Sequence, residues 1–189
     1  MNPITLPLIE DITGAMQFLD KDPEVAALVL TGNEKAFAAG GDIKFMKNLT
    51  FEKCYWSFMD SWKHMSHAKK PVIAAVNGFA LGRGCEMALL CDMILAGQKA
   101  IFGLPEITLG TIPGGGGTQR LVRTIGKSRA MQLCLTGNMI TAQQAETWGL
   151  ACSVHQPDQL LDEAIKLGEK IAKHSKLIVA MYKESVKKY

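Results

Sequence analysis

Several features are scarce in this sequence of 189 residues, and their scarcity narrows the classes of protein to which it can belong. The net charge is only +3, which is too small to indicate a nucleic-acid-binding surface but would not repel an anionic ligand. No run of 18 apolar residues is free of charges and glycines, so we expect no transmembrane helix. The first 17 residues match neither a secretory signal nor an arginine-rich transit pattern.

Cysteine is also sparse, and its arrangement argues against disulfide and zinc frameworks. The five cysteines are odd in number, none forms a Cys-x-x-Cys pair, and several lie in apolar stretches: Cys54, Cys85, Cys91, Cys134 and Cys152. This usage indicates reduced thiols in a reducing compartment. His64 and His67 lie three residues apart on a predicted helix, but without a nearby cysteine or acidic ligand we expect no metal site.

What is abundant is apolar sequence in short, regularly spaced segments. The hydrophobic content is 48% and the charged content 21%, which is typical of a folded globular chain. The length suffices for a sizeable core, and no linker, repeat or low-complexity segment divides it. We therefore expect a single domain spanning residues 1–189.

Hydrophobic periodicity predicts alternating helices and strands. Short apolar runs predict strands at 24–32, 70–81, 92–97, 99–103 and 151–155, and a strand end at 35–46 that passes into a glycine-rich loop. Helical spacing predicts helices at 6–22, 51–68, 85–91, 128–137, 141–150, 157–174 and 175–188, and a loop at 104–126 that feeds a further helix. The alternation predicts the α/β class. Thr141 followed by Gln144 is a capping-box signature.

Helix 51–68 carries four aromatic residues, which we interpret as core or subunit contacts and not as a cofactor site: Tyr55, Trp56, Phe58 and Trp62.

Two glycine-rich stretches offer backbone N–H groups in apolar surroundings. Gly40 and Gly41 follow a predicted strand, and the amides of Arg83 and Gly84 precede a predicted helix. Donors aimed at a developing oxyanion are worth about 10²–10³ in rate each. The alternative interpretation is that these glycines only form tight turns.

The four glycines at 114–117 resemble a phosphate-binding loop but lack its other parts. No Gly-Lys-Ser/Thr follows, and no acidic residue lies about twenty residues downstream. We interpret the run as a helix start packed close beneath a site.

Two carboxylates, Glu86 and Glu106, lie in apolar context on separate elements. If they face one cavity, their surroundings could separate their pKa values and suit them to acid–base catalysis. The alternative is that each satisfies the amides of a first helical turn. A third carboxylate, Asp92, is expected to order a helix end and a strand start.

Five stretches together, at 35–46, 69–93, 102–121, 135–150 and 175–186, resemble the enoyl-CoA hydratase/isomerase (crotonase) family, and specifically its mitochondrial short-chain hydratases. The motifs occur in the family's order and spacing. The resemblance implies a spiral of ββα units, an acyl-CoA thioester substrate and a homotrimer or hexamer. It implies no resident cofactor, because coenzyme A is part of the substrate. It also implies mitochondrial fatty-acid β-oxidation in a eukaryote, or a cytoplasmic location otherwise.

The resemblance also assigns residues. It places the oxyanion hole at the backbone N–H groups of Gly41 and Arg83, and it places Gly41, Asp42, Ile43, Lys44 and Arg83 against the substrate. It makes Glu86 the water-orienting base and Glu106 the acid that protonates Cα. Because both glutamates are present, hydration of a 2-trans-enoyl-CoA is favoured over enoyl-CoA isomerisation.

Two departures from the family pattern keep other functions open. Arg83 stands where glycine is usual; its Cβ would strain a positive φ, and its guanidinium could approach Glu86 or point outward to a phosphate. The family's N-terminal hairpin and C-terminal trimerisation helices have no counterpart here. These departures favour a non-catalytic acyl-CoA-binding homologue or an inactive fragment as the alternative. RNA binding would need the lysine stripe at residues 166, 170, 173 and 176, which acidic residues interrupt.

Overall fold

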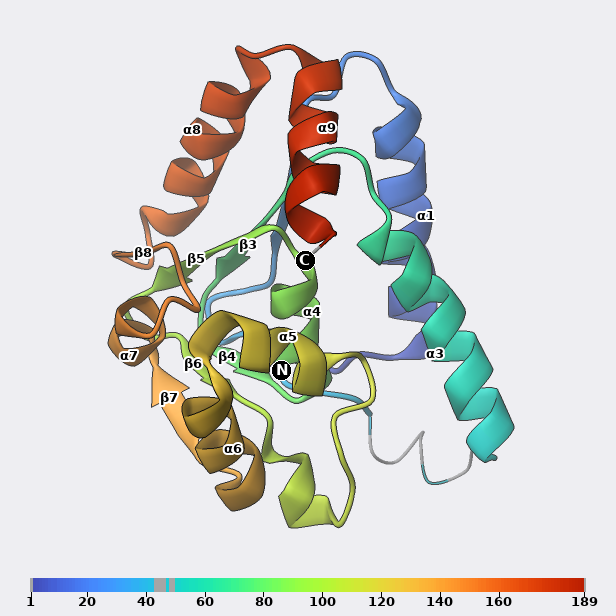
Figure 1. Cartoon of the computed structure of the whole chain (residues 1–189), viewed down its shortest axis with the longest axis vertical. Helices are drawn as coiled ribbons and strands as arrows, with labels where there is room; N and C mark the ends of the chain where they lie inside the picture. The colour runs from blue at the N-terminus through green and yellow to red at the C-terminus, as the bar shows by residue number, and fades with distance from the viewer. Residues whose placement is uncertain (1, 43–46, 48–49, 189) are drawn as a thin grey trace.

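Two four-stranded sheets form the centre of the molecule (Figure 1). The computed structural model describes residues 2–42, 47 and 50–188, with residues 51, 53–58 and 60 described by their backbone alone. The first sheet is parallel, in the order β1 (Leu28–Thr31), β3 (Val72–Val76), β5 (Met93–Gly97) and β8 (Ser153–His155). The second has the order β2 (Ala36–Ala38), β4 (Phe79–Leu81), β6 (Ile101–Gly103) and β7 (Met139–Thr141), and only β7 is antiparallel to its neighbour.

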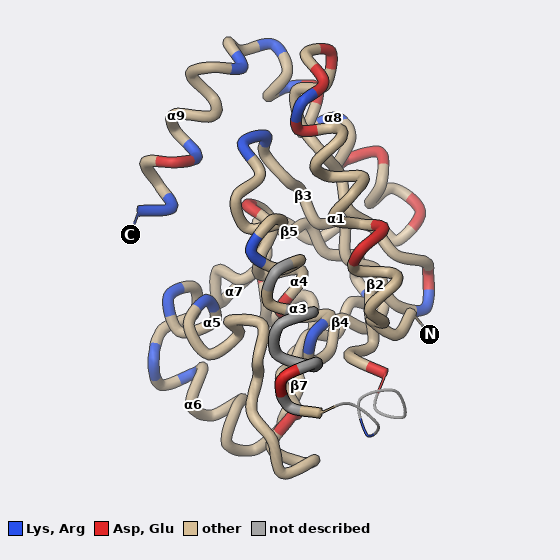
Figure 2. The backbone as a smooth tube through the Cα atoms, turned by 90° about the vertical axis from the view of Figure 1, so that its right-hand side faces the viewer, with Lys and Arg blue, Asp and Glu red and all other residues tan. Residues whose placement is uncertain are grey.

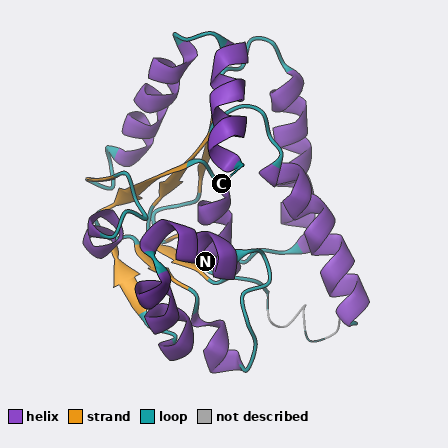
Figure 3. Cartoon of the chain, in the orientation of Figure 1, coloured by secondary structure: helices purple, strands orange, loops and turns teal. Residues whose placement is uncertain are grey.

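A ββα unit repeats along the chain and builds both sheets at once. In each unit the first strand joins the first sheet, the second strand joins the second sheet, and a helix follows (Figure 3). The helices of successive units are α3 (Phe51–Ser66), α4 (Arg83–Leu90) and, after the 3₁₀ helix η1 (Pro105–Leu109), α5 (Gly117–Ile125). The predicted α/β class and the spiral of ββα units are thereby confirmed.

The predicted single strand at 70–81 is wrong, because the chain leaves one sheet and enters the other within it. The segment forms β3 and β4, which lie in different sheets and are separated by Asn77 and Gly78. Gly78 has a φ of +60°, and a Cβ there would overlap the backbone of Lys35. Both strands are apolar, so hydrophobicity alone cannot reveal the change of sheet. Strand β7 and helix η1 were not predicted either, because each is very short.

Helix α4 lies at the centre of the core and contacts both sheets and α5. All its residues from Gly84 to Leu90 are buried. A Cβ at Gly84 would overlap the carbonyl of Ala38, so glycine permits the close approach of α4 to the end of β2. This packing brings the start of α4 beside the glycine-rich loop that follows β2.

Five further helices complete the described structure: α1 (Leu6–Lys21), α6 (Lys127–Thr136), α7 (Ala142–Thr147), α8 (Leu160–Ala172) and α9 (Lys176–Lys187). Helix α1 packs on α3, and α8 packs on the first sheet. The predicted capping box is confirmed, since Thr141 and Gln144 bond each other's backbone amides. Helix α8 begins at Leu160, three residues after Pro157, and not at the proline itself. None of the helices described is long and apolar enough to cross a bilayer.

Helix α9 follows α8 and is anchored by lysines, and Figure 2 shows it standing apart from α1 and α8. Lys183 Nζ lies 2.7 Å and Lys187 Nζ 3.0 Å from the two carboxylate oxygens of Asp92. Asp92 Oδ2 also accepts from the N–H of Val72, 2.8 Å away, at the start of β3. Asp92 was expected to order the end of its own helix and the strand that follows, but its carboxylate instead joins the start of β3 to α9.

The lysine stripe at 166, 170, 173 and 176 lies on α8 and the start of α9, where basic and acidic residues are interleaved (Figure 2). Lys166 pairs with Glu163 at 2.6 Å. The stripe is therefore partly neutralised by its own helix.

Candidate active site

Glu86 is fully buried in the first turn of α4, and its two carboxylate oxygens are treated differently. Oε1 accepts from the N–H of Gly115 at 2.7 Å and from the N–H of Gly117 at 2.8 Å. Oε2 is buried without a hydrogen-bond partner in the described structure. The alternative that Glu86 satisfies its own helix is wrong, because the amides it accepts belong to the start of α5. One oxygen is therefore anchored, and the other is available to a ligand.

The glycine run permits this anchorage because a side chain would displace the carboxylate. A Cβ at Gly115 would lie 2.8 Å from Glu86 Oε2, and one at Gly117 would lie 2.9 Å from Glu86 Oε1. The interpretation of the run as a helix start packed beneath a site is confirmed by these contacts. The glycine run donates its backbone N–H groups to the carboxylate of Glu86 and not to a phosphate.

Glu106 lies on η1, on the side of the site that faces the start of α4. Its Oε1 is 3.3 Å from the position that a Cβ on Gly82 would occupy, and its Oε2 is buried without a hydrogen-bond partner in the described structure. The negative charge of Glu86 acts on Glu106 and raises its pKa. The structure thus brings together the two carboxylates that the sequence placed on separate elements.

The surroundings raise the pKa of both carboxyl groups. Burial is the main cause for Glu106, the negative charge of Glu86 adds to it, and the pKa of Glu106 rises to about 7. Burial also raises the pKa of Glu86, but the amides of Gly117 and Gly115 oppose the rise because they stabilise the charged form. Glu106 is accordingly the carboxyl whose pKa lies near neutral pH.

The loop of Gly40 and Gly41 lies against the turn that begins α4. A Cβ on Gly82 would lie 3.9 Å from Gly40 Cα. The N–H of Ile4 donates to the Gly40 carbonyl at 2.8 Å. Because C=O and N–H point in opposite directions across a trans peptide, the Gly41 N–H points away from Ile4. Arg83 is the first residue of α4, so its N–H is one of those that a helix offers to acceptors outside itself.

Arg83 does not strain the backbone, which corrects the concern raised by its Cβ. The positive φ falls on Gly82, at +51°, and no described residue other than glycine has a positive φ. The Arg83 Nη1 atom is buried, and its charge lowers the pKa of both Glu86 and Glu106. The positive charge of Arg83 therefore acts on both carboxyl groups. For Glu86, burial outweighs this influence, so its pKa is raised and not lowered.

The other residues predicted to contact substrate are only partly covered by the described structure. Asp42 is half-buried next to Gly41, and its N–H donates to the Ile4 carbonyl at 3.3 Å. Ile43 and Lys44 lie outside the described residues.

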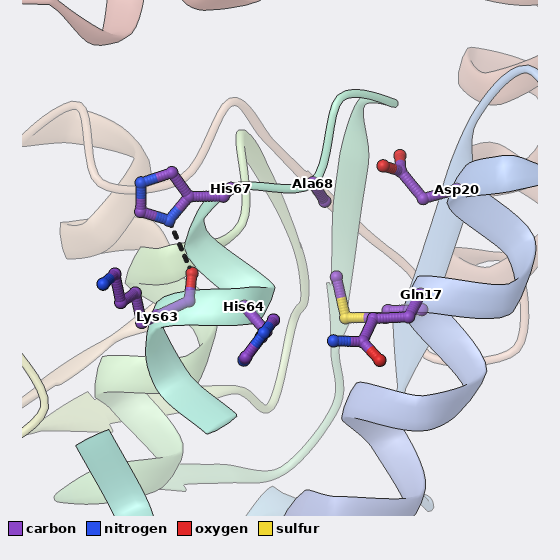
Figure 4. A pocket seen from close by; sticks show the side chains of 7 residues that line it. Gln17, Asp20, Lys63, His64, His67 and Ala68 are labelled. Carbon is purple, nitrogen blue, oxygen red and sulfur yellow. Dashed lines mark hydrogen bonds between the residues drawn. The ribbon is translucent and has the colours of Figure 1, made fainter. Parts of the chain in front are cut away.

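The two histidines line a separate hollow. His64 and His67 line a hollow of about 470 Å³ between α1 and α3, together with Gln17, Asp20 and Lys63 (Figure 4). His67 Nδ1 lies 2.7 Å from the Lys63 carbonyl. Among the described residues, no group of three or more potential metal ligands occurs.

Two residues that contact the glycine run were not predicted to belong to the site. Trp62, interpreted as a core residue, is indeed buried, but its Nε1–H donates to the Gly115 carbonyl at 2.5 Å. Arg120 Nη1 donates to the same carbonyl at 2.8 Å. An arginine three residues after a glycine run is a weak signal in the sequence that it contacts the run. Nothing in the sequence indicated that Trp62 does so.

With this geometry established, comparison with known proteins shows that the chain belongs to the enoyl-CoA hydratase/isomerase family, which it matches over residues 1–189. It is 54% identical to a mitochondrial enoyl-CoA hydratase of Pongo abelii over 187 residues, which are 98% of this chain and 64% of that protein. It is 52% identical to a probable mitochondrial enoyl-CoA hydratase of Dictyostelium discoideum, again over 98% of this chain and over 68% of the relative.

A solved structure also has a similar fold. The crystal structure of an enoyl-CoA hydratase from Bacillus anthracis superposes with a TM-score of 0.92 at 37% identity, covering 98% of this chain and 73% of that one. The predicted crotonase-like fold is thereby confirmed. The chain spans slightly less than two thirds of the Pongo abelii relative's length.

Proposed function

We propose that this chain catalyses the syn addition of water to a 2-trans-enoyl-CoA thioester, forming a 3-hydroxyacyl-CoA in fatty-acid β-oxidation. The observation that carries the proposal is the pair of buried carboxylates. Glu86 and Glu106 come from different elements, the charge of Glu86 raises the pKa of Glu106, and each has a buried Oε2 with no hydrogen-bond partner in the described structure. Two such oxygens suit a water molecule that must both lose a proton and be oriented.

The chemistry divides between the two glutamates. Glu86 takes a proton from water as the water oxygen bonds to Cβ of the enoyl group. Electrons of the double bond move onto the thioester oxygen, where the N–H groups of Gly41 and Arg83 stabilise the negative charge. When the electrons on the thioester oxygen move back toward Cα, Cα takes the proton from Glu106. Transfer of the proton held by Glu86 to Glu106 restores the starting state.

The two pKa directions support this division. A raised pKa, to about 7 for Glu106, keeps an acid protonated near neutral pH. Two amide hydrogen bonds favour the ionised form of Glu86, as a base requires. No resident cofactor or metal enters this scheme, since coenzyme A belongs to the substrate.

The family resemblance suggests the assembly, and the names of two relatives suggest the compartment. We propose a homotrimer or a dimer of trimers, with an acyl-CoA thioester as the small-molecule partner. The names of two relatives include the word mitochondrial, so we propose the mitochondrial matrix if the chain comes from a eukaryote.

One observation favours a second candidate, a homologue that binds acyl-CoA without turnover. The positive charge of Arg83 lowers the pKa of both carboxyl groups. A cation that stabilises the charged carboxylates makes each of them a weaker base toward water. Enoyl-CoA isomerisation is a weaker candidate, because it does not call for both glutamates.

The test is hydration of crotonyl-CoA by the purified chain, followed by loss of the ultraviolet absorbance of the conjugated thioester. We expect turnover, and we expect Glu86→Gln and Glu106→Gln each to lower kcat by about 10² or more. Glu184→Gln, an exposed glutamate on α9, is the matched control and should leave the rate unchanged. Binding of crotonyl-CoA without turnover by the parent would favour the second candidate. Double-bond migration in a 3-enoyl-CoA without hydration would favour the isomerase.

A further inference from the structure

The carbonyl of Gly115 is held from two sides by side chains that the proposed chemistry does not use. Trp62 Nε1 donates to it at 2.5 Å from α3, and Arg120 Nη1 donates to it at 2.8 Å from α5. A carbonyl oxygen has two lone pairs, so these two donors occupy its full accepting capacity. Trp62 is 5% exposed, so its N–H would otherwise be buried without a partner.

Gly115 also holds Glu86, through its backbone N–H. The Gly115 N–H donates to Glu86 Oε1 at 2.7 Å, and the Gly117 N–H donates at 2.8 Å. Any rotation of the backbone at Gly115 therefore moves an anchor of the carboxylate. Glycine backbones have more conformational freedom than any other, so such a run needs external contacts to stay fixed.

The adjacent Gly116 shows how closely the Arg120 side chain lies against this loop. Gly116 has a φ of +92°, and a Cβ there would overlap Arg120 Nη1. Arg120 reaches back over the loop from the first turn of the helix that the loop begins. The arginine thus closes the loop onto its own helix, while Trp62 ties it to α3.

We propose that Trp62 and Arg120 are positioning residues for the carboxylate of Glu86: by holding the Gly115 carbonyl they fix the two amides that anchor Oε1, and so aim Oε2 at the reacting water. Neither side chain touches the substrate in this proposal. It rests on the proposed function for its kinetic consequence, but the fixed geometry of the loop can be measured without turnover.

The proposal predicts a change in the titration of Glu86 when either contact is lost. The charged and titratable groups that act on Glu86 in the described structure are Arg83 and Cys85 on its own helix, Glu106 on η1 and Arg120 on α5. Removal of the Trp62 N–H changes none of these charges. A change in titration in that variant would therefore arise from weaker amide bonds to Oε1, which at present lower the pKa of Glu86.

The experiment compares Trp62→Phe and Arg120→Gln with the parent. We expect each to lower kcat for crotonyl-CoA about five- to tenfold, as expected for one weakened hydrogen bond, with KM within twofold. In Trp62→Phe the low-pH limb of kcat/KM, where Glu86 must be ionised, should move to higher pH. Arg120→Lys retains a charged donor and should recover part of the lost rate.

A second measurement does not depend on catalysis. The amide resonances of Gly115 and Gly117 should follow the ionisation of Glu86 in a pH titration by NMR, and in Trp62→Phe both should shift and titrate at higher pH. Trp148→Phe and Arg123→Gln are matched controls, because the Trp148 ring lies under Arg129 and Arg123 bonds Gln119. They should change neither readout.

The outcomes separate the two proposals. If the parent hydrates crotonyl-CoA but Trp62→Phe and Arg120→Gln leave the pH limb and the glycine amides unchanged, the positioning role is refuted, even if both variants are less stable. If the parent does not hydrate crotonyl-CoA while the glycine amides respond as expected, the proposed function is refuted and the positioning of Glu86 stands.

Discussion

Because the pKa of Glu106 is raised, we predict that this residue destabilises the folded protein at alkaline pH, although the proposed reaction requires it. Folding moves the pKa of its carboxyl from 4.5 to about 7. The folded state therefore binds a proton over a pH range in which the unfolded state has released it. The favourable contribution of this proton binding to the free energy of unfolding is complete below pH 4.5. It is lost as the pH rises through about 7.

The magnitude follows from the size of the pKa change. A rise from 4.5 to about 7 corresponds to about 3 kcal/mol. Glu106 is only half-buried, so solvent screening reduces the effect, and we expect about 1.5 kcal/mol. Glu106→Gln removes the titration, so the variant should gain about 1.5 kcal/mol relative to the parent at pH 8, and little at pH 4.5.

The assay is urea unfolding followed by circular dichroism at pH 4.5, 6 and 8, together with hydration of crotonyl-CoA at each pH. The variant should lose about 10² or more in kcat, while its stability advantage over the parent grows with pH. Glu184→Gln, on the surface of α9, should show no such growth. A stability difference between Glu106→Gln and the parent that stays constant from pH 4.5 to 8 would refute the raised pKa.

Three further predictions concern the backbone, the arginine and the C-terminal helix. Gly117→Ala places a methyl group 2.9 Å from Glu86 Oε1 and should lower hydration at least tenfold, whereas Gly114→Ala, with open space around its Cβ, should not; equal rates would contradict the argument. Arg83→Gly should increase the hydration rate and move the Glu106 titration to higher pH, and an unchanged pH profile would show that the guanidinium has no influence. Asp92→Asn should cost about 3 kcal/mol in urea unfolding because it leaves the buried Lys183 ammonium without its anion; a loss below 1 kcal/mol would contradict this.

The sequence predicted the elements well wherever periodicity was long enough to read. Helix α1 was expected at 6–22 and spans Leu6–Lys21, and α9 was expected at 175–188 and spans Lys176–Lys187. The strand at 70–81 failed because β3 and β4 are both apolar and only their partners differ. A change of sheet depends on contacts with distant strands, which local hydrophobicity does not record.

In the candidate site, too, the sequence identified which residues carry the chemistry but not where they lie in space. Glu86 and Glu106 were identified because a carboxylate in an apolar segment must be paired, solvated or used. Their proximity, and the raised pKa that follows from burial, could not be predicted from their positions in the chain. The electrostatic effect of Arg83 on the two glutamates was likewise left open.

By itself, the sequence determined the alternation of helices and strands, the family and the identity of the two glutamates, because these depend on residue type, order and spacing. Only the tertiary structure decided what holds Glu86. Its amide donors lie 29 and 31 residues away, and Trp62 lies 53 residues from the carbonyl that it fixes. Contacts over such separations depend on how α3, α4 and α5 pack, and the packing is a property of the whole core and not of any one segment.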